Sequence, residues 1–147
     1  MQMSEGAYAG DILPREAWKI LETDPASVLI DVRTNAEWAY VGFADLSQLG
    51  KQPLFVPWQL FPKMDINPEF SAQMAGVGID IGSHREAPLL FLCRSGVRSK
   101  NAAIAMTAEG FARCYNIAHG FEGDPDGAKH RGRVNGWKVD GLAWVQG

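Results

Sequence analysis

The residues best suited to chemistry lie in one short run, Cys93-Arg94-Ser95-Gly96-Val97-Arg98-Ser99. A cysteine is nucleophilic as its thiolate, and neighbouring cations or a helix N-terminus favour that form. The run contains two arginines, and its glycine accepts the positive φ that turns successive backbone N–H groups inward as an anion-binding nest. We therefore expect Cys93 to be a nucleophile in a loop that also stabilises an anionic group transferred to it.

The elements around this run should place it at a ligand-binding edge. Residues 88–93 are a short apolar run typical of a strand covered on both faces, and residues 99–109 have helical periodicity that ends at Gly110, a residue suited to a helix C-cap. A loop after a parallel strand lies where α/β proteins bind their ligands. The helix that follows presents unpaired N–H groups and its positive dipole end, so an anion is expected beside Cys93.

Apolar runs alternate with helical segments along the rest of the chain. The pattern predicts a loop at residues 42–53, together with strands at 27–32, 54–58 and 114–118 and helices at 14–22, 34–40 and 67–74. Such alternation is typical of an α/β domain with a mainly parallel central sheet and helices on both faces. We therefore expect one core rather than two catalytic domains.

Length and composition exclude several classes of protein. The chain has 147 residues, which suits one domain, and its 46% hydrophobic and 21% charged residues argue against a disordered protein. A net charge of −3 is too close to neutral for a protein built around a nucleic-acid backbone. We find no secretory leader and no run of the ~20 apolar residues that a membrane span needs. With two cysteines, the chain suits a reducing compartment, so we expect a cytoplasmic protein that binds neither nucleic acid nor membranes.

At the cysteine loop the sequence resembles the rhodanese (sulfurtransferase) family. Leu29-Ile30-Asp31-Val32-Arg33, followed by Glu37-Trp38, is similar to the family's Asp-Val-Arg strand end and its Glu-aromatic pair. Asn101-Ala102-Ala103 continues the helix as in many members, and residues 115–123 are similar to the strand and glycine turn near the family's end. The resemblance covers residues 11–123.

The bounds of the resemblance divide the chain into three segments. Residues 1–10 are an N-terminal extension, residues 11–123 a rhodanese-like domain, and residues 124–147 a C-terminal extension. We expect the last to pack back on the domain, because an unstructured end would expose Trp137, Leu142 and Trp144 to water.

The resemblance implies a sulfurtransferase without a cofactor. Sulfane sulfur from thiosulfate or a similar small anionic donor would form a persulfide on Cys93 and pass to cyanide, a thiol or a protein acceptor. Asp31 and Arg33 would support the site. The donor would be bound by two orienting arginines and by loop amides, drawn from Arg94, Ser95, Gly96, Val97, Arg98 and Ser99.

Two other functions stay open at this point. The first is a phosphatase-type or arsenate-reducing activity. Phosphatases of related fold have a loop one residue longer, whereas only six residues run from Cys93 to Arg98. A shorter loop brings the amides closer to a single sulfur atom, which favours sulfur transfer. The second alternative is a module that carries persulfide to a protein partner or only binds anions.

Two departures from the family pattern concern the surroundings of the loop. Gly42-Phe43-Ala44 stands where many members have Gly-His-Ile, so any role of that histidine is lost. His119-Gly120-Phe121 stands where a glycine pair is common, and a polar insertion separates it from Trp137. We expect this second change to reshape one wall of the pocket.

The other chemically capable residues have plainer interpretations. Asp31 and Arg33, with Glu37, are expected to pair charges at a helix start. Cys114 is expected to be a packed thiol rather than a resolving cysteine. The histidines share no metal-ligand spacing with each other or with the cysteines, so no metal site is expected. A basic run is interpreted as a solvated tail, with a docking surface for an acidic partner as the alternative, and comprises Lys129, Arg131, Arg133 and Lys138.

Overall fold

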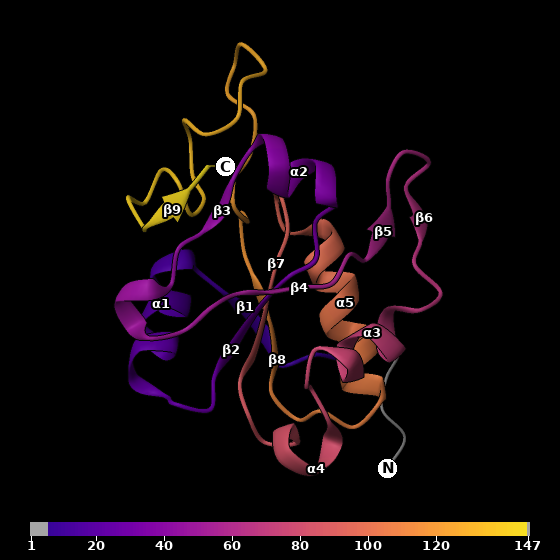
Figure 1. Cartoon of the computed structure of the whole chain (residues 1–147). Coiled ribbons are helices and arrows are strands. Elements are labelled where there is room, and N and C mark those ends of the chain that lie inside the picture. The colour runs from indigo at the N-terminus through magenta and orange to yellow at the C-terminus, as the bar shows by residue number, and fades with distance from the viewer. Residues whose placement is uncertain (1–5, 147) are drawn as a thin grey trace.

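A five-stranded sheet forms the centre of the protein in a computed structural model that describes residues 6–146 (Figure 1). Every strand pairing in this sheet is parallel, so all five carboxyl ends lie along one edge. This confirms the predicted α/β fold with a mainly parallel sheet. The strands in spatial order are β1 (Gly10–Ile12), β8 (Cys114–Ile117), β7 (Leu89–Leu92), β2 (Val28–Asp31) and β4 (Leu54–Phe55).

One face of the sheet is covered by α1 (Pro14–Thr23) and by the C-terminal segment (Figure 1). Pro14 occupies the first helical turn, where its missing N–H is not needed, and the Glu16 carboxylate accepts the Leu13 N–H at 2.9 Å. Alternate strand residues point to this face. The buried cluster here is Ile12, Ala17, Leu21, Leu29, Ala44, Leu46, Leu90, Leu92, Ile117, Phe121 and Trp137.

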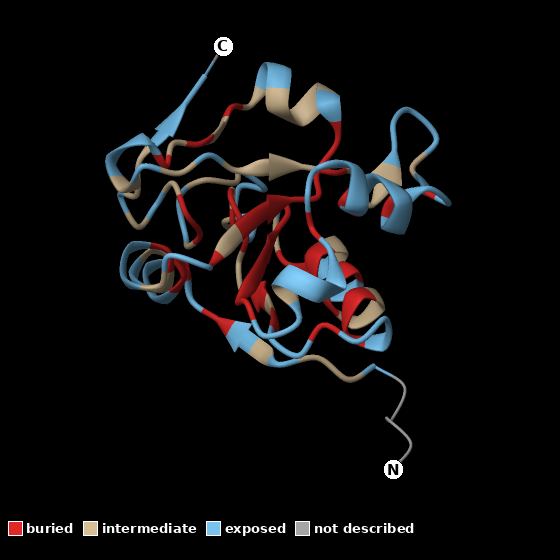
Figure 2. Ribbon diagram, turned by 60° about the horizontal axis from the view of Figure 1, so that its bottom comes forward, coloured by how far each residue is buried: buried red, intermediate tan, exposed pale blue. Residues whose placement is uncertain are grey.

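The opposite face is covered by α3 (Phe70–Gly76) and α5 (Val97–Ala108) (Figure 1). The short helix α4 (Ile81–His84) lies at the end of the sheet away from α2 (Asn35–Tyr40). Buried residues concentrate in the strands and on the inner sides of the helices (Figure 2). The cluster on this side includes Ile30, Val32, Val56, Phe70, Met74, Leu89, Phe91, Cys93, Ala102, Ala103 and Met106. Helices on both faces therefore enclose β2 and β7, as the prediction requires.

Two predicted helices begin two or three residues away from the expected position. α5 begins at Val97, two residues before the predicted start, because Gly96 with φ +111° forms the N-cap turn. α3 begins at Phe70, three residues after its predicted start, because Asn67 forms a turn first: its Oδ1 accepts the Glu69 N–H at 2.9 Å. Pro68 therefore precedes this helix.

The prediction of a loop at residues 42–53 was wrong in part. This segment contains β3 (Phe43–Ala44) and the 3-10 turn Ser47–Leu49. β3 pairs antiparallel with β9 (Trp144–Val145), a partner about 100 residues away that no local pattern reveals. A short hairpin, β5 (Gln59–Leu60) and β6 (Asp65–Ile66), was also missed and projects beside α5 (Figure 1).

The C-terminal segment lies against the face that α1 covers. Trp137 is fully buried, its ring centre is 5.9 Å from that of Trp18, and its Nε1 donates to the Ala143 carbonyl at 2.9 Å. Leu142 is partly buried against the same cluster, whereas Trp144 is 36% exposed. The first five residues of the predicted N-terminal extension lie outside the described residues. Across residues 6–146, every helix is too short or too polar to cross a bilayer.

Candidate active site

Cys93 lies at the carboxyl edge of the sheet, directly after β7 and three residues before the N-cap of α5. The chain reverses at Gly96, whose φ of +111° would strain any other residue. This turn aims the Gly96 N–H at the Cys93 sulfur, with the nitrogen 3.1 Å from Sγ. The twelve-residue helix that follows directs its N-terminus toward the same region, so both features stabilise negative charge on the sulfur.

A second polar contact to the sulfur comes from the first turn of α5. The Ser99 hydroxyl lies 3.1 Å from Cys93 Sγ and 2.5 Å from Asn116 Oδ1. Asn116 Nδ2 in turn donates to Asp11 Oδ1 at 3.0 Å, which fixes the amide with its oxygen toward Ser99. A hydroxyl has one proton, so Ser99 can donate to either the sulfur or Asn116, but not to both at once.

Asp11 and Asn116 are site residues that the sequence analysis missed. The hydrogen bond from Asn116 is the largest cause that holds the pKa of Asp11 below its ordinary value, and Tyr8 and Lys100 act in the same direction. Asn116 stands in a buried strand position, and the strand beside it leads into the cysteine loop. A polar residue in the apolar run 114–118 was the available signal.

The turn after β8 clamps the cysteine loop through the backbone. Phe121 N donates to the Cys93 carbonyl at 2.8 Å, and Glu122 N and Gly123 N donate to the Arg94 carbonyl at 3.0 and 3.1 Å. Gly120 permits this approach, because a Cβ there would lie 2.4 Å from the Cys93 carbonyl oxygen. The turn therefore holds the loop in place and carries Glu122 to the edge of the site.

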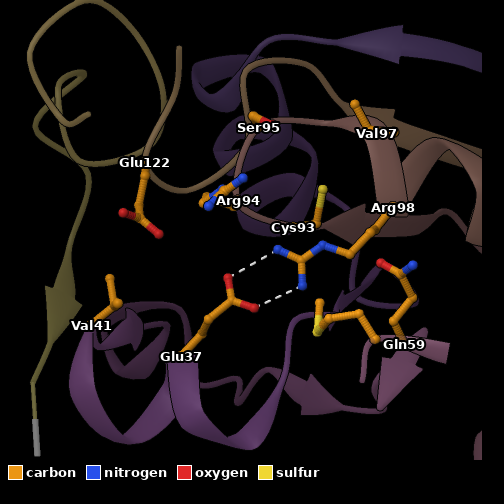
Figure 3. A pocket seen from close by; sticks show the side chains of 10 residues that line it. Glu37, Val41, Gln59, Cys93, Arg94, Ser95, Val97, Arg98 and Glu122 are labelled. Atoms are coloured by element: carbon orange, nitrogen blue, oxygen red, sulfur yellow. Dashed lines mark hydrogen bonds and ion pairs between the residues drawn. The ribbon is translucent and has the colours of Figure 1, made fainter. Parts of the chain in front are cut away.

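A cavity of about 550 Å³ opens over the loop (Figure 3). The Cys93 residue is only 1% exposed, so its sulfur lies at the inner end of this space. Charged and apolar side chains share the lining. The lining residues are Glu37, Val41, Gln59, Met64, Cys93, Arg94, Ser95, Val97, Arg98 and Glu122.

Glu37 and Arg98 form a bidentate ion pair across this cavity (Figure 3). The two Arg98 terminal nitrogens lie 2.7 and 3.0 Å from the two carboxylate oxygens. Burial alone would raise the pKa of Glu37, but the hydrogen bonds and charge of Arg98 outweigh it and lower that pKa. Burial would likewise lower the pKa of Arg98, and Glu37 reverses this effect. Both groups are therefore held in their charged forms.

The predicted charge pairing at the start of α2 (Asn35–Tyr40) was right for one pair and wrong for Glu37. Arg33 is fully buried and binds the Asp31 carboxylate at 2.7 to 3.2 Å, as well as the Gly42 carbonyl at 2.7 Å. Its guanidinium carbon lies 4.4 Å from the centre of the Phe121 ring. Glu37 pairs instead with Arg98, because its side chain points across the cavity. Asp31 and Arg33 therefore connect β2 to Phe121 in the turn after β8. Neither residue lines the cavity.

The remaining candidates do not line the cavity. His119 Nδ1 is 3.7 Å from Asp124, and His84 Nδ1 is 4.0 Å from Asp80. In the described part of the chain no three His, Cys, Asp or Glu side chains gather as a metal site needs. Cys114 is fully buried, and this burial raises the pKa of its thiol to about 11.

The basic run is spread over the C-terminal segment. Arg131 donates to the Gly123 carbonyl at 2.6 Å, and Arg133 lies 3.9 Å from Asp126. Lys138 sits over the Trp144 ring, with its nitrogen 4.1 Å from the ring centre. Lys129 is exposed. Several of these cations are therefore engaged within the segment itself.

Residues 13–124 match the family model described as "Rhodanese-like domain". This range contains every strand of the central sheet except β1, together with the cysteine loop. The chain belongs to the rhodanese family. This confirms the resemblance found in the sequence. The matched residues include Cys93 and the loop that follows it.

Known relatives of this rhodanese-like chain include solved and uncharacterised proteins. Rv0390 from M. tuberculosis has a crystal structure with 43% sequence identity and a TM-score of 0.86, covering 96% of this chain and all of that one. The uncharacterized protein RP600 homolog of Rickettsia rickettsii is 36% identical over 91% of this chain and 95% of that protein.

Another relative is named for an activity. The thiosulfate sulfurtransferase GlpE of Actinobacillus pleuropneumoniae is 26% identical over 77% of this chain and 83% of that protein. The fold is also similar to that of the polysulfide-sulfur transferase homodimer from Wolinella succinogenes, with a TM-score of 0.60 over 93% of this chain and 78% of that one. At 21% identity the latter likeness concerns the fold alone. The family match and the relative named for thiosulfate sulfurtransferase activity support a place for the chain in a sulfurtransferase family.

Proposed function

We propose that this protein transfers sulfane sulfur from thiosulfate or a similar donor to cyanide or a thiol acceptor through a persulfide on Cys93. The observation that carries the proposal is the environment of one sulfur atom. Cys93 Sγ lies at the inner end of a cavity, 3.1 Å from both the Gly96 nitrogen and the Ser99 hydroxyl. A thiolate and a persulfide at this position would meet the same donors.

The first half of the reaction loads the enzyme. The Cys93 thiolate attacks the outer sulfur of thiosulfate, a bond forms between Sγ and that sulfur, and the bond to the sulfonate group breaks. Sulfite leaves with the bonding electron pair, and Cys93 carries an anionic persulfide. The Gly96 N–H and the N-terminus of α5 stabilise the charge on sulfur before and after the transfer.

The second half of the reaction releases the sulfur. Cyanide or a thiolate attacks the outer persulfide sulfur, the S–S bond breaks, and the Cys93 thiolate leaves. This route needs a nucleophile and a good leaving group at the same atom, and no separate base. The same contacts that stabilise the thiolate make it a better leaving group, so they assist both halves.

The short loop favours sulfur over phosphorus chemistry. Only six residues run from Cys93 to Arg98, and the backbone turns back at Gly96, whose N–H points at the sulfur. A tetrahedral phosphate needs room for three oxygens between the nucleophile and the loop amides. Sulfur transfer needs room for one atom, which is what this loop geometry supports.

Mass spectrometry of the intact protein tests this function. The reduced protein is incubated with thiosulfate and, in a second sample, with cysteine persulfide, then with cyanide. We expect a gain of one sulfur atom from at least one donor, and its removal by cyanide with release of thiocyanate. Cys93→Ser should gain none under either condition.

The outcome against the proposal is equally specific. If Cys93 is shown to be a free, unoxidised thiol and takes up sulfur from neither donor, the proposed activity is wrong. Cys114→Ala serves as a matched control, since this variant keeps the loop and removes the other thiol. Loss of sulfur release in Cys114→Ala would show that Cys114 takes part after all.

A further inference from the structure

The cavity over Cys93 carries no surplus of positive charge to attract an anionic donor. Its charged lining among the described residues consists of Arg94, Arg98, Glu37 and Glu122, two of each sign. Both Arg98 terminal nitrogens are engaged by Glu37, as Figure 3 shows. Arg94 is therefore left to meet a donor, and Glu122 points into the same space (Figure 3).

A backbone hydrogen bond holds Glu122 in this position. Its N–H donates to the Arg94 carbonyl at 3.0 Å as part of the turn that clamps the cysteine loop. The residue is half-buried, so its charge is screened less than that of a fully exposed side chain. The carboxylate thus faces the approach to Cys93 at a place that the fold itself holds.

The rest of the cavity is suited to an organic group. Val41, Met64 and Val97 line it beside the charged residues. Its volume of about 550 Å³ is in the range of cavities that hold small organic molecules, and far exceeds the size of a five-atom ion. A small, highly charged donor would leave the apolar lining unused.

We propose that Glu122 selects against dianionic donors, and that the site is built for an organic persulfide, R–S–SH, whose group R contacts the apolar lining. This inference rests on the proposed persulfide on Cys93 and narrows its donor. Thiosulfate carries two negative charges and must approach both Glu122 and the Cys93 thiolate. A persulfide group carries at most one negative charge, so both repulsions are weaker than for thiosulfate.

The transfer from such a donor balances without an oxidant or reductant. The Cys93 thiolate attacks the outer sulfur of R–S–SH, a bond forms between Sγ and that sulfur, and the S–S bond of the donor breaks. The proton stays on the transferred sulfur, and R–S⁻ leaves with the electron pair. One thiolate is consumed and one is released, so the charge is unchanged.

The test measures the rate of sulfur loading on Cys93 with two donors, the dianion thiosulfate and cysteine persulfide, which carries less negative charge. The proteins are wild type, Glu122→Gln and Glu22→Gln, the last removing an exposed charge on α1 outside the cavity. We expect wild type to load faster from cysteine persulfide. In Glu122→Gln the ratio of thiosulfate rate to persulfide rate should rise about tenfold, which corresponds to about 1.4 kcal/mol. Added salt should shrink this effect, and Glu22→Gln should keep the wild-type ratio.

The outcomes distinguish failure of this inference from failure of the proposed sulfur transfer. If wild type loads from thiosulfate as fast as from cysteine persulfide, or if Glu122→Gln leaves the ratio unchanged, Glu122 is not a selector and this inference fails alone. If Cys93 loads from neither donor, the proposed function fails with it. Circular dichroism checks that Glu122→Gln is folded, and Glu122→Asp, which keeps the charge, should stay closer to wild type than Glu122→Gln.

Discussion

The two cysteines of this protein are buried to the same degree but differ in what surrounds the sulfur. Cys93 is 1% exposed and Cys114 is 0% exposed; Cys93 follows β7, and Cys114 begins the neighbouring strand β8. Cys93 follows the carboxyl end of β7, where a backbone N–H and a hydroxyl contact its sulfur and a cavity opens. Cys114 begins β8 at the opposite end and packs among apolar side chains.

This comparison shows that two equally buried thiols can have different chemical surroundings. Burial raises the pKa of Cys114 to about 11, although a contact with Thr107 acts in the other direction. Its sulfur lies 3.7 Å from the Phe111 carbonyl, an acceptor that suits the protonated thiol. At Cys93 the groups nearest the sulfur are a backbone N–H and a hydroxyl, and both can donate a hydrogen bond to it.

The largest effect is expected when each cysteine is replaced by serine in a separate variant. Cys93→Ser should abolish thiocyanate formation from a sulfane donor and cyanide, a loss of at least about a thousandfold, because the nucleophile is gone. Cys114→Ser should keep turnover within about threefold while lowering the free energy of unfolding by about 1–3 kcal/mol, since a polar hydroxyl replaces a packed thiol. Steady-state turnover and urea denaturation measure the two effects. Comparable loss of turnover in both folded variants would abolish the contrast between the cysteines.

Alkylation should separate the two thiols by at least about a hundredfold near neutral pH. Cys93 has access to the cavity, whereas Cys114 has neither access nor thiolate. Any labelling of Cys114 should rise with pH toward 11, because its thiolate fraction grows in that direction. Iodoacetamide time courses with peptide mapping measure both rates, and urea should erase the difference. Equal rates in the folded protein would contradict the account.

Removal of one donor to the sulfur should have a moderate effect. In Ser99→Ala the Cys93 sulfur loses a hydroxyl at 3.1 Å, and Asn116 loses its partner. We expect sulfur loading to slow about tenfold to thirtyfold, the usual cost of one hydrogen bond to a charged group. Ser83→Ala, which changes an exposed hydroxyl on α4, should load at the wild-type rate. A Ser99→Ala rate equal to wild type would remove the hydroxyl from the mechanism.

The smallest effect concerns the ion pair that frames the cavity. Glu37→Gln should lower the free energy of unfolding by about 1–2 kcal/mol at pH 7, because Arg98 loses its partner in a partly buried position. The pKa of Glu37 is lowered in the folded state, so this contribution is present above the ordinary carboxyl pKa and is lost as pH falls through the folded value. Urea denaturation should therefore show wild type and variant converging below about pH 4. A pH-independent difference would contradict this origin of the stability.

The parts of the site that could be predicted from the sequence are those set by neighbouring residues. The β7 run, the glycine at position 96 and the helix after it lie within about 20 residues, and each follows from local pattern. The Asp31 and Arg33 pairing is equally local. The family resemblance predicted more of the fold than hydrophobic periodicity did, because a strand as short as β4 gives only a weak hydrophobic pattern.

The parts that escaped prediction join distant segments. Glu37 meets Arg98 across 61 positions, and Asn116 meets Asp11 across 105. Only the three-dimensional arrangement shows that Arg98 is occupied by Glu37 and that Glu122 faces the cavity. Side-chain pairing between segments depends on sheet order and register, which the sequence of one chain does not reveal residue by residue.

The most direct test of the central claim is to locate the transferred sulfur. The reduced protein is exposed to cysteine persulfide or thiosulfate, its thiols are blocked by alkylation, and peptide mass mapping shows which cysteine carries the added sulfur. Our account predicts the sulfur on Cys93, with Cys114 unmodified, and its loss after cyanide treatment. Sulfur on Cys114, or on both cysteines equally in the folded protein, would contradict the claim that the donors and cavity around Cys93 create the reactive site.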